Sequence, residues 1–296
     1  QTALHADETF LKRQADDADQ LKNACMFFLC SRVEQIAHAT VKTQAGKGCV
    51  RPDNQMIYME YQEQRKHDHV VELLRDYRGK IHSDCYEGYE KLADKDQFTW
   101  QICLAHARRN FIKAPGSPIA TKIEEQLGKI IHEDNKLWAF KAPERLRLRK
   151  KKIKPLMDEL LFDLRKLRND QKVKTCEKLT RAFDYILKRE KHVVGFLADS
   201  DLMLDNNLAE RAIRPVKIGQ KNWLFIGSEK GGESSAIMYS LLLSCKNIGV
   251  NPQAWLTDVI RNLPYTKPED YRSLLPNNWT PKANSTSPYL PADYKI

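Results

Sequence analysis

Ile81-His82-Ser83-Asp84 and Leu4-His5-Ala6-Asp7 share one pattern, in which a short segment carries a histidine and ends on an aspartate. Side chains alternate between the two faces of a β-strand, so the histidine and the aspartate of each segment lie on the same face. We therefore expect Asp7 and Asp84 to close the first and the fourth strand of one sheet, at the same end of that sheet.

The first 113 residues are typical of a mixed sheet with helices packed on it. Apolar residues recur at helical spacing in His67–Tyr77, before the fourth strand, and in Ala105–Ile112, after the fifth. The glycines and the proline of Lys42–Asp53 predict a long loop between the second and third strands. The five predicted strands are Thr2–Asp7, Cys25–Arg32, Met56–Gln62, Lys80–Asp84 and Thr99–Cys103.

The rest of the chain is predicted to be helical, with a change of composition at its end. Residues 115–200 show helical patterns only. A short helix from about Leu204, a glycine-marked stretch and a helix through Ser234–Asn247 follow. Six of the 13 prolines fall in the last 33 residues, which predicts an extended or partly disordered arm beyond Leu263.

The net charge of +10 is concentrated in one internal segment. Between Lys141 and Lys191 there are 18 Lys and Arg against 8 Asp and Glu. The remainder holds 49 − 18 = 31 basic and 39 − 8 = 31 acidic residues, so the excess lies entirely in this segment. A basic helical segment is a candidate surface for the phosphate backbone of a nucleic acid, and a solvated helical face is the alternative.

Composition and motifs exclude several classes of protein. No apolar run approaches the roughly 18–20 residues of a membrane span, and the charged opening does not resemble a signal peptide. Seven scattered cysteines favour a reducing, intracellular setting over a disulfide framework. Gly227–Gly232 has the spacing of a phosphate-binding loop, but Glu233 stands where that loop requires a lysine. Cys103-x-x-His106 favours a buried thiol beside a helical histidine over structural zinc.

A third acidic residue, Glu210, follows Asn206-Asn207, where an asparagine cap would start a helix and place the glutamate in its first turn. If Glu210 meets Asp7 and Asp84, the three carboxylates form an oxygen-ligand site suited to Mg²⁺ or Mn²⁺. Two such ions, about 3.5–4 Å apart, can activate a water or a 3′-hydroxyl for phosphodiester displacement.

Structural interpretations of the same acidic residues stay open at this point. Asp7 and Asp84 could start loops by forming Asx turns. Glu210 could complete a capping box with Asn207 or pair with Arg214 at i,i+4. The two histidines, His5 and His82, are expected to be core or supporting groups rather than metal ligands.

A second basic cluster follows Glu210 and contains no acidic residue: Arg211, Arg214, Lys217 and Lys221. We interpret it as a phosphate-contacting surface. Arg108 and Arg109, on the helix after the fifth strand, could approach DNA or form a solvated helical edge. For Trp223 and Phe225 we favour packing in the core over stacking on an unpaired base.

Four segments resemble the insertion sequence 66 family of bacterial transposases: HADET (5–9), IHSDCYEGY (81–89), CLAHARRNF (103–111) and, above all, DNNLAERAIRPVKIGQKNWLFIGS (205–228). NPQAWLTDVIRNLP (251–264) extends the resemblance, which covers the chain to about Trp279 and is weakest in the helical segment and in Glu34–Asp53.

This resemblance implies an α/β, ribonuclease-H-like fold of the DDE type, in which a mixed five-stranded sheet is flanked by helices and an all-helical insertion precedes the last catalytic helix. Asp7, Asp84 and Glu210 would be the catalytic, metal-binding acids, with two Mg²⁺ or Mn²⁺ as cofactors. The implied division is a first part of the catalytic core (1–114), a basic helical insertion (115–200), the last part of the core (201–263) and a proline-rich arm (264–296).

The implied activity is nicking of the ends of a mobile element and transfer of the freed 3′-hydroxyl into target DNA. Double-stranded DNA is then the partner, a homodimer or higher multimer is the expected assembly, and the cytoplasm, in association with the nucleoid, is the expected location. Two other functions remain open, a DNA-binding remnant without catalysis and a structure-specific nuclease on the same fold.

Overall fold

A computed structural model describes residues 3–14, 20–31, 56–93, 95, 97–114 and 116–280. Within them the chain forms an α/β fold with one mixed five-stranded sheet in the order β3-β2-β1-β4-β5, which confirms the predicted class and strand number. The strands are β1 (Ala3–Gln14), β2 (Leu21–Ser31), β3 (Ile57–Gln62), β4 (Lys80–Ser83) and β5 (Thr99–Ile102). β1, β2 and β3 pair antiparallel, whereas β4 and β5 run parallel to β1.

The first strand is longer than predicted, and this changes the position of Asp7. β1 continues to Gln14 because its pairing with β2 continues to the Gln14–Leu21 pair, and because Leu11 still faces the core. Asp7 therefore lies within β1 and does not close it. The parallel pairing with β4 extends only as far as the His5–His82 pair, so Asp7 lies just beyond the part of β1 that β4 covers.

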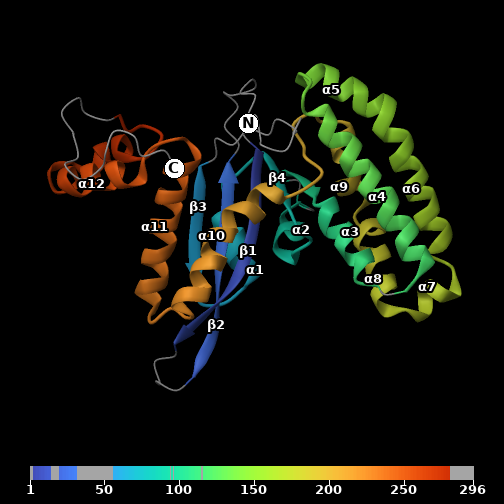
Figure 1. Cartoon of the computed structure of the whole chain (residues 1–296), viewed down its shortest axis with the longest axis horizontal. Helices are drawn as coiled ribbons and strands as arrows, with labels where there is room; N and C mark the ends of the chain where they lie inside the picture. Colours follow the sequence, from blue (N-terminus) through green and yellow to red (C-terminus); the bar gives the residue numbers. More distant parts are fainter. Residues whose placement is uncertain are drawn as a thin grey trace.

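Helices cover both faces of this sheet. α1 (His67–Leu73) and α2 (Glu87–Ala93) pack on one face, where Val70 and Tyr89 join Phe27 in the main core. α2 was not predicted, and the first helix ends at Leu73, four residues before the predicted end at Tyr77. On the other face α10 (Asn207–Trp223) crosses β1 and β2, and α11 (Glu229–Asn247) runs beside β3 (Figure 1).

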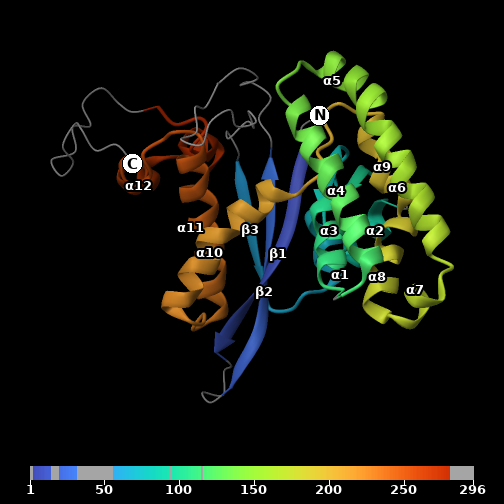
Figure 2. The ribbon, with the colours of Figure 1, turned by 45° about the vertical axis from the view of Figure 1, so that its right-hand side comes forward.

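Between β5 and α10 the described residues, 103–114 and 116–206, form helices joined by turns and short loops, with no strand. α3 packs against α4 and α8, and Figure 2 shows α4, α6 and α8 gathered on the β5 side of the sheet. Apolar side chains of these helices extend the main core away from the sheet. The helices are α3 (Leu104–Ile112), α4 (Pro118–Leu137), α5 (Ala142–Leu148), a π-helix (Arg149–Ile153), α6 (Lys154–Leu167), α7 (Gln171–Thr175), α8 (Glu177–Leu187), α9 (Glu190–Val194) and a 3₁₀ turn (Gly195–Leu197).

Three of the glycines in the predicted glycine-marked stretch, Gly219, Gly231 and Gly232, lie instead inside helices, and two of them allow close packing. A Cβ at Gly219 would come within 2.5 Å of the Tyr239 hydroxyl, and one at Gly232 within 2.5 Å of the Tyr61 ring. These glycines therefore permit close approach of α10 to α11 and of α11 to β3, which explains them without any turn. α10 runs through Gly219, so the helix is 17 residues long rather than short.

The described part of the proline-rich end is not an extended arm. α12 (Pro252–Asn262) is followed by 3₁₀ helices at Leu263–Tyr265 and Pro268–Leu274, because proline is well tolerated in the first turn of a helix. Two tryptophan indoles fasten this region, since Trp255 donates to the Leu274 carbonyl (2.9 Å) and Trp279 to Asp258 (2.8 Å). The loop predicted at Lys42–Asp53 and residues 281–296 lie outside the described residues.

Candidate active site

Asp7 and Asp84 occupy neighbouring positions on adjacent strands. His5 pairs with His82 in the parallel β1–β4 register, and each aspartate comes two residues later. Asp84 directly follows the last residue of β4, so the predicted position at the end of that strand is correct. Because residues two apart on a strand share a face, the Asp7 carboxylate projects on the side of the sheet that α10 covers, whereas Asp84 lies just beyond the end of β4.

The two histidines join the segment before α10 to the sheet. Their rings stack, with centroids 4.2 Å apart and planes 7° apart. The Nδ1 atom of His5 lies 3.1 Å from the Asn206 side-chain oxygen, and His82 Nε2 accepts a hydrogen bond from the Met203 backbone (2.7 Å). Asn206 also donates its amide to the Ala6 carbonyl (2.7 Å). His5 and His82 are therefore supporting core groups, as expected, and Asn206, which the sequence pattern marked only as part of a helix cap, supports the site as well.

Glu210 lies in the first turn of α10, at the end that Asn206 fixes to β1. Its carboxylate forms an ion pair with Arg109 of α3 and lies 3.7 Å from His106 Nε2. Asn206 caps the helix without a side-chain cap hydrogen bond, so no capping box forms at this terminus. The ion pair found for Glu210 among the described residues is thus with α3, not with Arg214 on its own helix.

The electrostatics of Asp7 show that the three carboxylates interact. Burial first, and then the negative charges of Asp84 and Glu210, raise the pKa of Asp7 to about 7, against the lowering effect of a hydrogen bond from the Glu8 backbone. Asp84 accepts a hydrogen bond from the Tyr86 backbone (3.0 Å), so it forms an Asx-type turn contact, whereas Asp7 lies inside a strand. The ligand-type oxygens of Asp7, Asp84 and Glu210 do not all lie within 4.8 Å of one another, so these described residues influence one another by charge but do not form a closed set of metal ligands. Mutually repelling carboxylates favour a bound cation.

A further acidic residue, Glu8, was missed by the sequence reasoning. Its side chain is only 4% exposed and forms an ion pair with Arg65, whose guanidinium lies 3.9 Å from the centre of the Tyr86 ring. Burial first, and then the charge of Asp84, raise the pKa of Glu8 to about 8, against the lowering effect of Arg65. Glu8 lies on the face of the sheet that α1 and α2 cover, opposite to Asp7. The sequence pattern ended the first strand at Asp7, so only the longer observed strand shows that the Glu8 side chain points into the core.

Cys103, His106 and Glu210 are brought together by the fold. Their ligand-type atoms all lie within 4.8 Å of one another, and they are the group of this kind found in the described part of the chain. The Cys103 thiol accepts a hydrogen bond from the Asn206 backbone (3.2 Å), and burial raises its pKa to about 12. Arg109 lies 3.2 Å from His106, and its positive charge opposes a cation there. The buried thiol beside a helical histidine remains our interpretation.

The basic residues after Glu210 lie on the exposed side of α10. Successive spacings of three, three and four residues place them in one stripe along the helix, hereafter the α10 stripe: Arg211, Arg214, Lys217 and Lys221. None of the four forms an ion pair with another described residue. Lys217 donates to the Phe10 carbonyl (3.0 Å).

The remaining predicted site residues have structural partners. Arg108 pairs with Glu124 of α4, and Arg109 pairs with Glu210, so α3 carries both arginines in ion pairs. Trp223 packs against the core between α10 and the sheet, as predicted. Phe225 is 39% exposed, so the prediction that it packs in the core is wrong. The reversal of the chain at Leu224, which has a φ of 62°, leaves Phe225 outside the packed face of α10.

Comparison with known proteins gives one family across most of the chain. Residues 1–234 match the model of the transposase IS66 family, and residues 240–277 match the IS66 C-terminal element. Two similar curated proteins, Uncharacterized protein y4hP and Uncharacterized protein y4jD of Sinorhizobium fredii (strain NBRC 101917 / NGR234), are 32% and 30% identical over 234 and 260 residues. The matches cover 73% and 84% of this chain but 42% and 50% of those proteins. No helix in the described ranges has the length and hydropathy needed to span a membrane.

Proposed function

This chain belongs to the IS66 family of transposases, and we propose that it carries the catalytic core of a DDE-type enzyme that nicks the ends of a mobile element and transfers the freed 3′-hydroxyl into target DNA. The observation that carries the proposal is the juxtaposition of Asp7 and Asp84 on adjacent strands, with the charge of Glu210 acting on the same carboxylate. Asp7, Asp84 and Glu210 are the proposed catalytic residues.

The architecture supports a ribonuclease-H-like fold. The sheet has three antiparallel strands followed by two parallel ones, with the first strand in the middle. We divide the chain accordingly into core segments 1–114 and 201–263, the helical insertion 115–200 and the C-terminal part 264–296. Residues Asn206 and Cys103 connect the helix of the third acid to the first and last strands of this core.

The three carboxylates fit divalent cations. Their donors are hard oxygens, which suit Mg²⁺ or Mn²⁺. The raised pKa of Asp7, caused first by burial and then by the neighbouring acids, reports a local excess of negative charge. When two ions are bound, they activate the attacking water or 3′-hydroxyl and stabilise the leaving oxygen. Asp7, Asp84 and Glu210 would hold the ions. To bind an ion, Glu210 would give up part of its ion pair with Arg109.

Double-stranded DNA is the proposed partner, and the α10 stripe is the proposed contact surface. The stripe begins one residue after Glu210, so phosphates lying along α10 would lead toward the carboxylates. Its cations are exposed and have no acidic partner among the described residues, so binding a phosphate breaks no ion pair. Because a transposase would act on two element ends held together, the proposed assembly is a homodimer or a larger multimer. Because its substrate would be DNA, the proposed location is the cytoplasm, in association with the nucleoid.

The proposal is tested by Asp84→Asn, with Glu87→Gln as the control. Asp84→Asn should lower Mg²⁺-dependent cleavage of element-end DNA at least about a hundredfold, since even supporting groups of metal sites contribute 10–100-fold. DNA binding should be retained. Glu87 is an exposed carboxylate that pairs with Lys91 on the surface of α2, so its loss should leave cleavage unchanged.

A metal titration and a joining assay separate the alternatives. Mg²⁺ or Mn²⁺ should stabilise the wild type by about 2.7 kcal/mol at a hundred times Kd, and Asp84→Asn should lose this gain. A flat titration with salt-sensitive DNA binding would instead identify a non-catalytic remnant. Joined products of element-end and target DNA distinguish a transposase from a structure-specific nuclease, which only cuts.

A further inference from the structure

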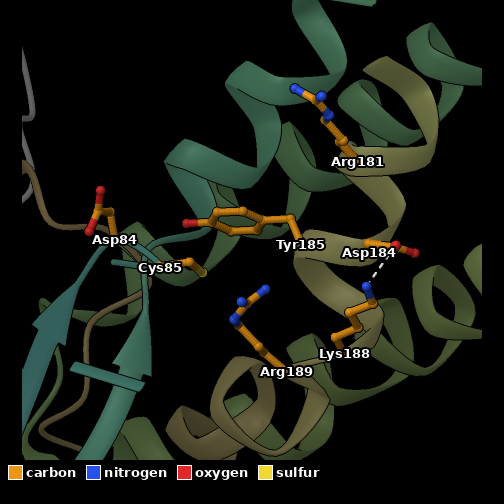
Figure 3. Close-up of a pocket in the computed structure, with 7 residues that line it drawn as sticks. All are labelled: Asp84, Cys85, Arg181, Asp184, Tyr185, Lys188 and Arg189. Atoms are coloured by element: carbon orange, nitrogen blue, oxygen red, sulfur yellow. Dashed lines mark ion pairs between the residues drawn. The ribbon is translucent and has the colours of Figure 1, made fainter. Parts of the chain in front are cut away.

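A pocket of about 400 Å³ lies between the helical insertion and Asp84. Asp84 and Cys85 line it from the end of β4, and the other side is formed by α8 and the residues that follow it (Figure 3). The residues from that side are Arg181, Asp184, Tyr185, Lys188 and Arg189. The insertion therefore supplies most of the wall of a cavity whose other end is one of the proposed catalytic acids.

Two of these cations are held only by surface ion pairs. Arg181 pairs with Glu177, and both side chains are 77% exposed. Lys188 is 67% exposed and lies 3.1 Å from Asp184, which also accepts from Arg168 (3.0 Å). Exposed pairs contribute about 0–1 kcal/mol, so an anion in the pocket can replace Glu177 or Asp184 as the partner at little cost. Asp184 would still keep Arg168.

The inner part of the pocket is more rigid. Arg189 is 20% exposed and donates to Glu90 of α2 (2.6 Å), so it ties the insertion to the sheet domain beside the pocket. Tyr185 is half-buried, and in Figure 3 its hydroxyl points toward Asp84 and Cys85 while its ring lines the space between Asp84 and α8. A cationic rim, an aromatic wall and a volume of about 400 Å³ suit a single nucleotide.

We infer that this pocket binds the nucleotide adjacent to the reacting phosphodiester, with its phosphate between Arg181 and Lys188 and its sugar or base against Tyr185. The inference rests on the proposed function in taking Asp84 as the position of the reacting phosphate. It assigns a defined part of the insertion, one face of α8, to the DNA strand. The larger positive charge of the insertion is not needed for it.

The test measures binding of a fluorescent oligothymidylate to the Asp84→Asn protein, in which no cleavage interferes. Adding Arg181→Gln and Lys188→Gln should weaken binding about tenfold and lower the slope of log affinity against log salt by about 1.4, or about 0.7 per contact with a single strand. The control pair is Lys172→Gln and Lys174→Gln on α7, which removes the same charge from two exposed lysines elsewhere on the insertion. It should change affinity by less than about twofold.

Thymidine 3′,5′-bisphosphate and inorganic phosphate serve as smaller probes in thermal-shift titrations. The bisphosphate should stabilise the protein more than phosphate does, and Tyr185→Leu, but not Tyr185→Phe, should remove the difference, because stacking needs the ring. Equal losses in the α7 and α8 variants, or a bisphosphate that binds no better than phosphate, would overturn the inference.

The two proposals fail in different ways. If Arg181→Gln with Lys188→Gln leaves strand binding and the cleavage KM unchanged while Asp84→Asn still abolishes cleavage, the pocket assignment is wrong and the catalytic one stands. If the α8 variant weakens strand binding but Asp84→Asn cleaves normally, the pocket binds a strand and the catalytic assignment is wrong.

Discussion

The helical insertion and the α10 stripe are both rich in cations, yet they use them differently. At least eight of the 18 basic residues between 141 and 191 form ion pairs within the fold. They are Arg147, Arg149, Lys154, Arg165, Arg168, Arg181, Lys188 and Arg189. The four cations of the α10 stripe have no such partner among the described residues. Net charge therefore overstates the number of unpaired cations that the insertion offers and understates that of α10, and under the proposed function the same holds for their contributions to DNA binding.

Arg149 is the extreme case within the insertion. It is fully buried and forms two hydrogen bonds with Asp134 (2.7 and 2.9 Å), and it donates to the carbonyls of Phe196 and Asp199. The π-helix that starts at Arg149 places it in the core at the beginning of a basic run. Arg149 belongs to the most basic stretch of the sequence, yet its contacts are structural. They connect α4 to the segment that precedes α10.

The largest effect that would sharpen this comparison is expected for Arg149→Met. Removing one partner of a buried ion pair leaves Asp134 uncompensated, so the free energy of unfolding should fall by about 3–5 kcal/mol. Urea unfolding measures it, and the exposed neighbour provides the control, since Lys150→Met should change stability by no more than about 0.5 kcal/mol. Equal, small effects of the two substitutions would show that the basic run is one solvated surface.

An intermediate effect is expected for Arg211→Gln with Arg214→Gln in the α10 stripe. Loss of two phosphate contacts should lower the salt slope of duplex binding by about 1.8, because each contact contributes about 0.9. The matched control is Arg147→Gln with Lys154→Gln, two insertion cations that pair with Glu144 and Asp158. If the control lowers the slope as much as the α10 variant, total charge governs binding and the distinction between the two regions is lost.

The smallest effect concerns Arg109, a cation paired with a proposed catalytic acid. Arg109→Gln should improve Mg²⁺ affinity, read from thermal stabilisation, about fivefold, since it removes roughly 1 kcal/mol of repulsion at a half-exposed site. Arg108→Gln is the control on the same helix, because Arg108 pairs with Glu124 of α4 instead. A weaker Mg²⁺ affinity in Arg109→Gln would show that this arginine positions Glu210 for the ion rather than competing with it.

Local patterns were sufficient for much of the fold. The His-x-Asp segments identified two neighbouring strands and placed both histidines on one face, because alternation of side chains is a property of any strand. Asn206-Asn207 identified the start of α10 with Glu210 in its first turn. The full length of β1 was missed, since Glu8 and Lys12 look like the end of a strand until β2 is known to pair with them.

The three acids of the proposed site were chosen from the sequence, whereas the residues that contact them could not be. Asp7, Asp84 and Glu210 could be selected from motif and resemblance. Three contacts around the site join residues about a hundred or more positions apart, so no local spacing could reveal them. They are the pair of Glu210 with Arg109, the contact of His5 with Asn206, and the position of Tyr185 beside the space near Asp84.

The sequence by itself determined which residues can form strands and helices and where charge accumulates, because these depend on neighbours in the chain. Only the tertiary structure decided which charges are neutralised. Arg149, in the basic run, becomes a core residue because the fold brings Asp134 beside it. The arginines on α10 stay exposed and without an ion-pair partner among the described residues, because the fold brings no acidic residue beside them. Coulomb energies depend on distance and burial, and both are fixed only when remote segments pack together.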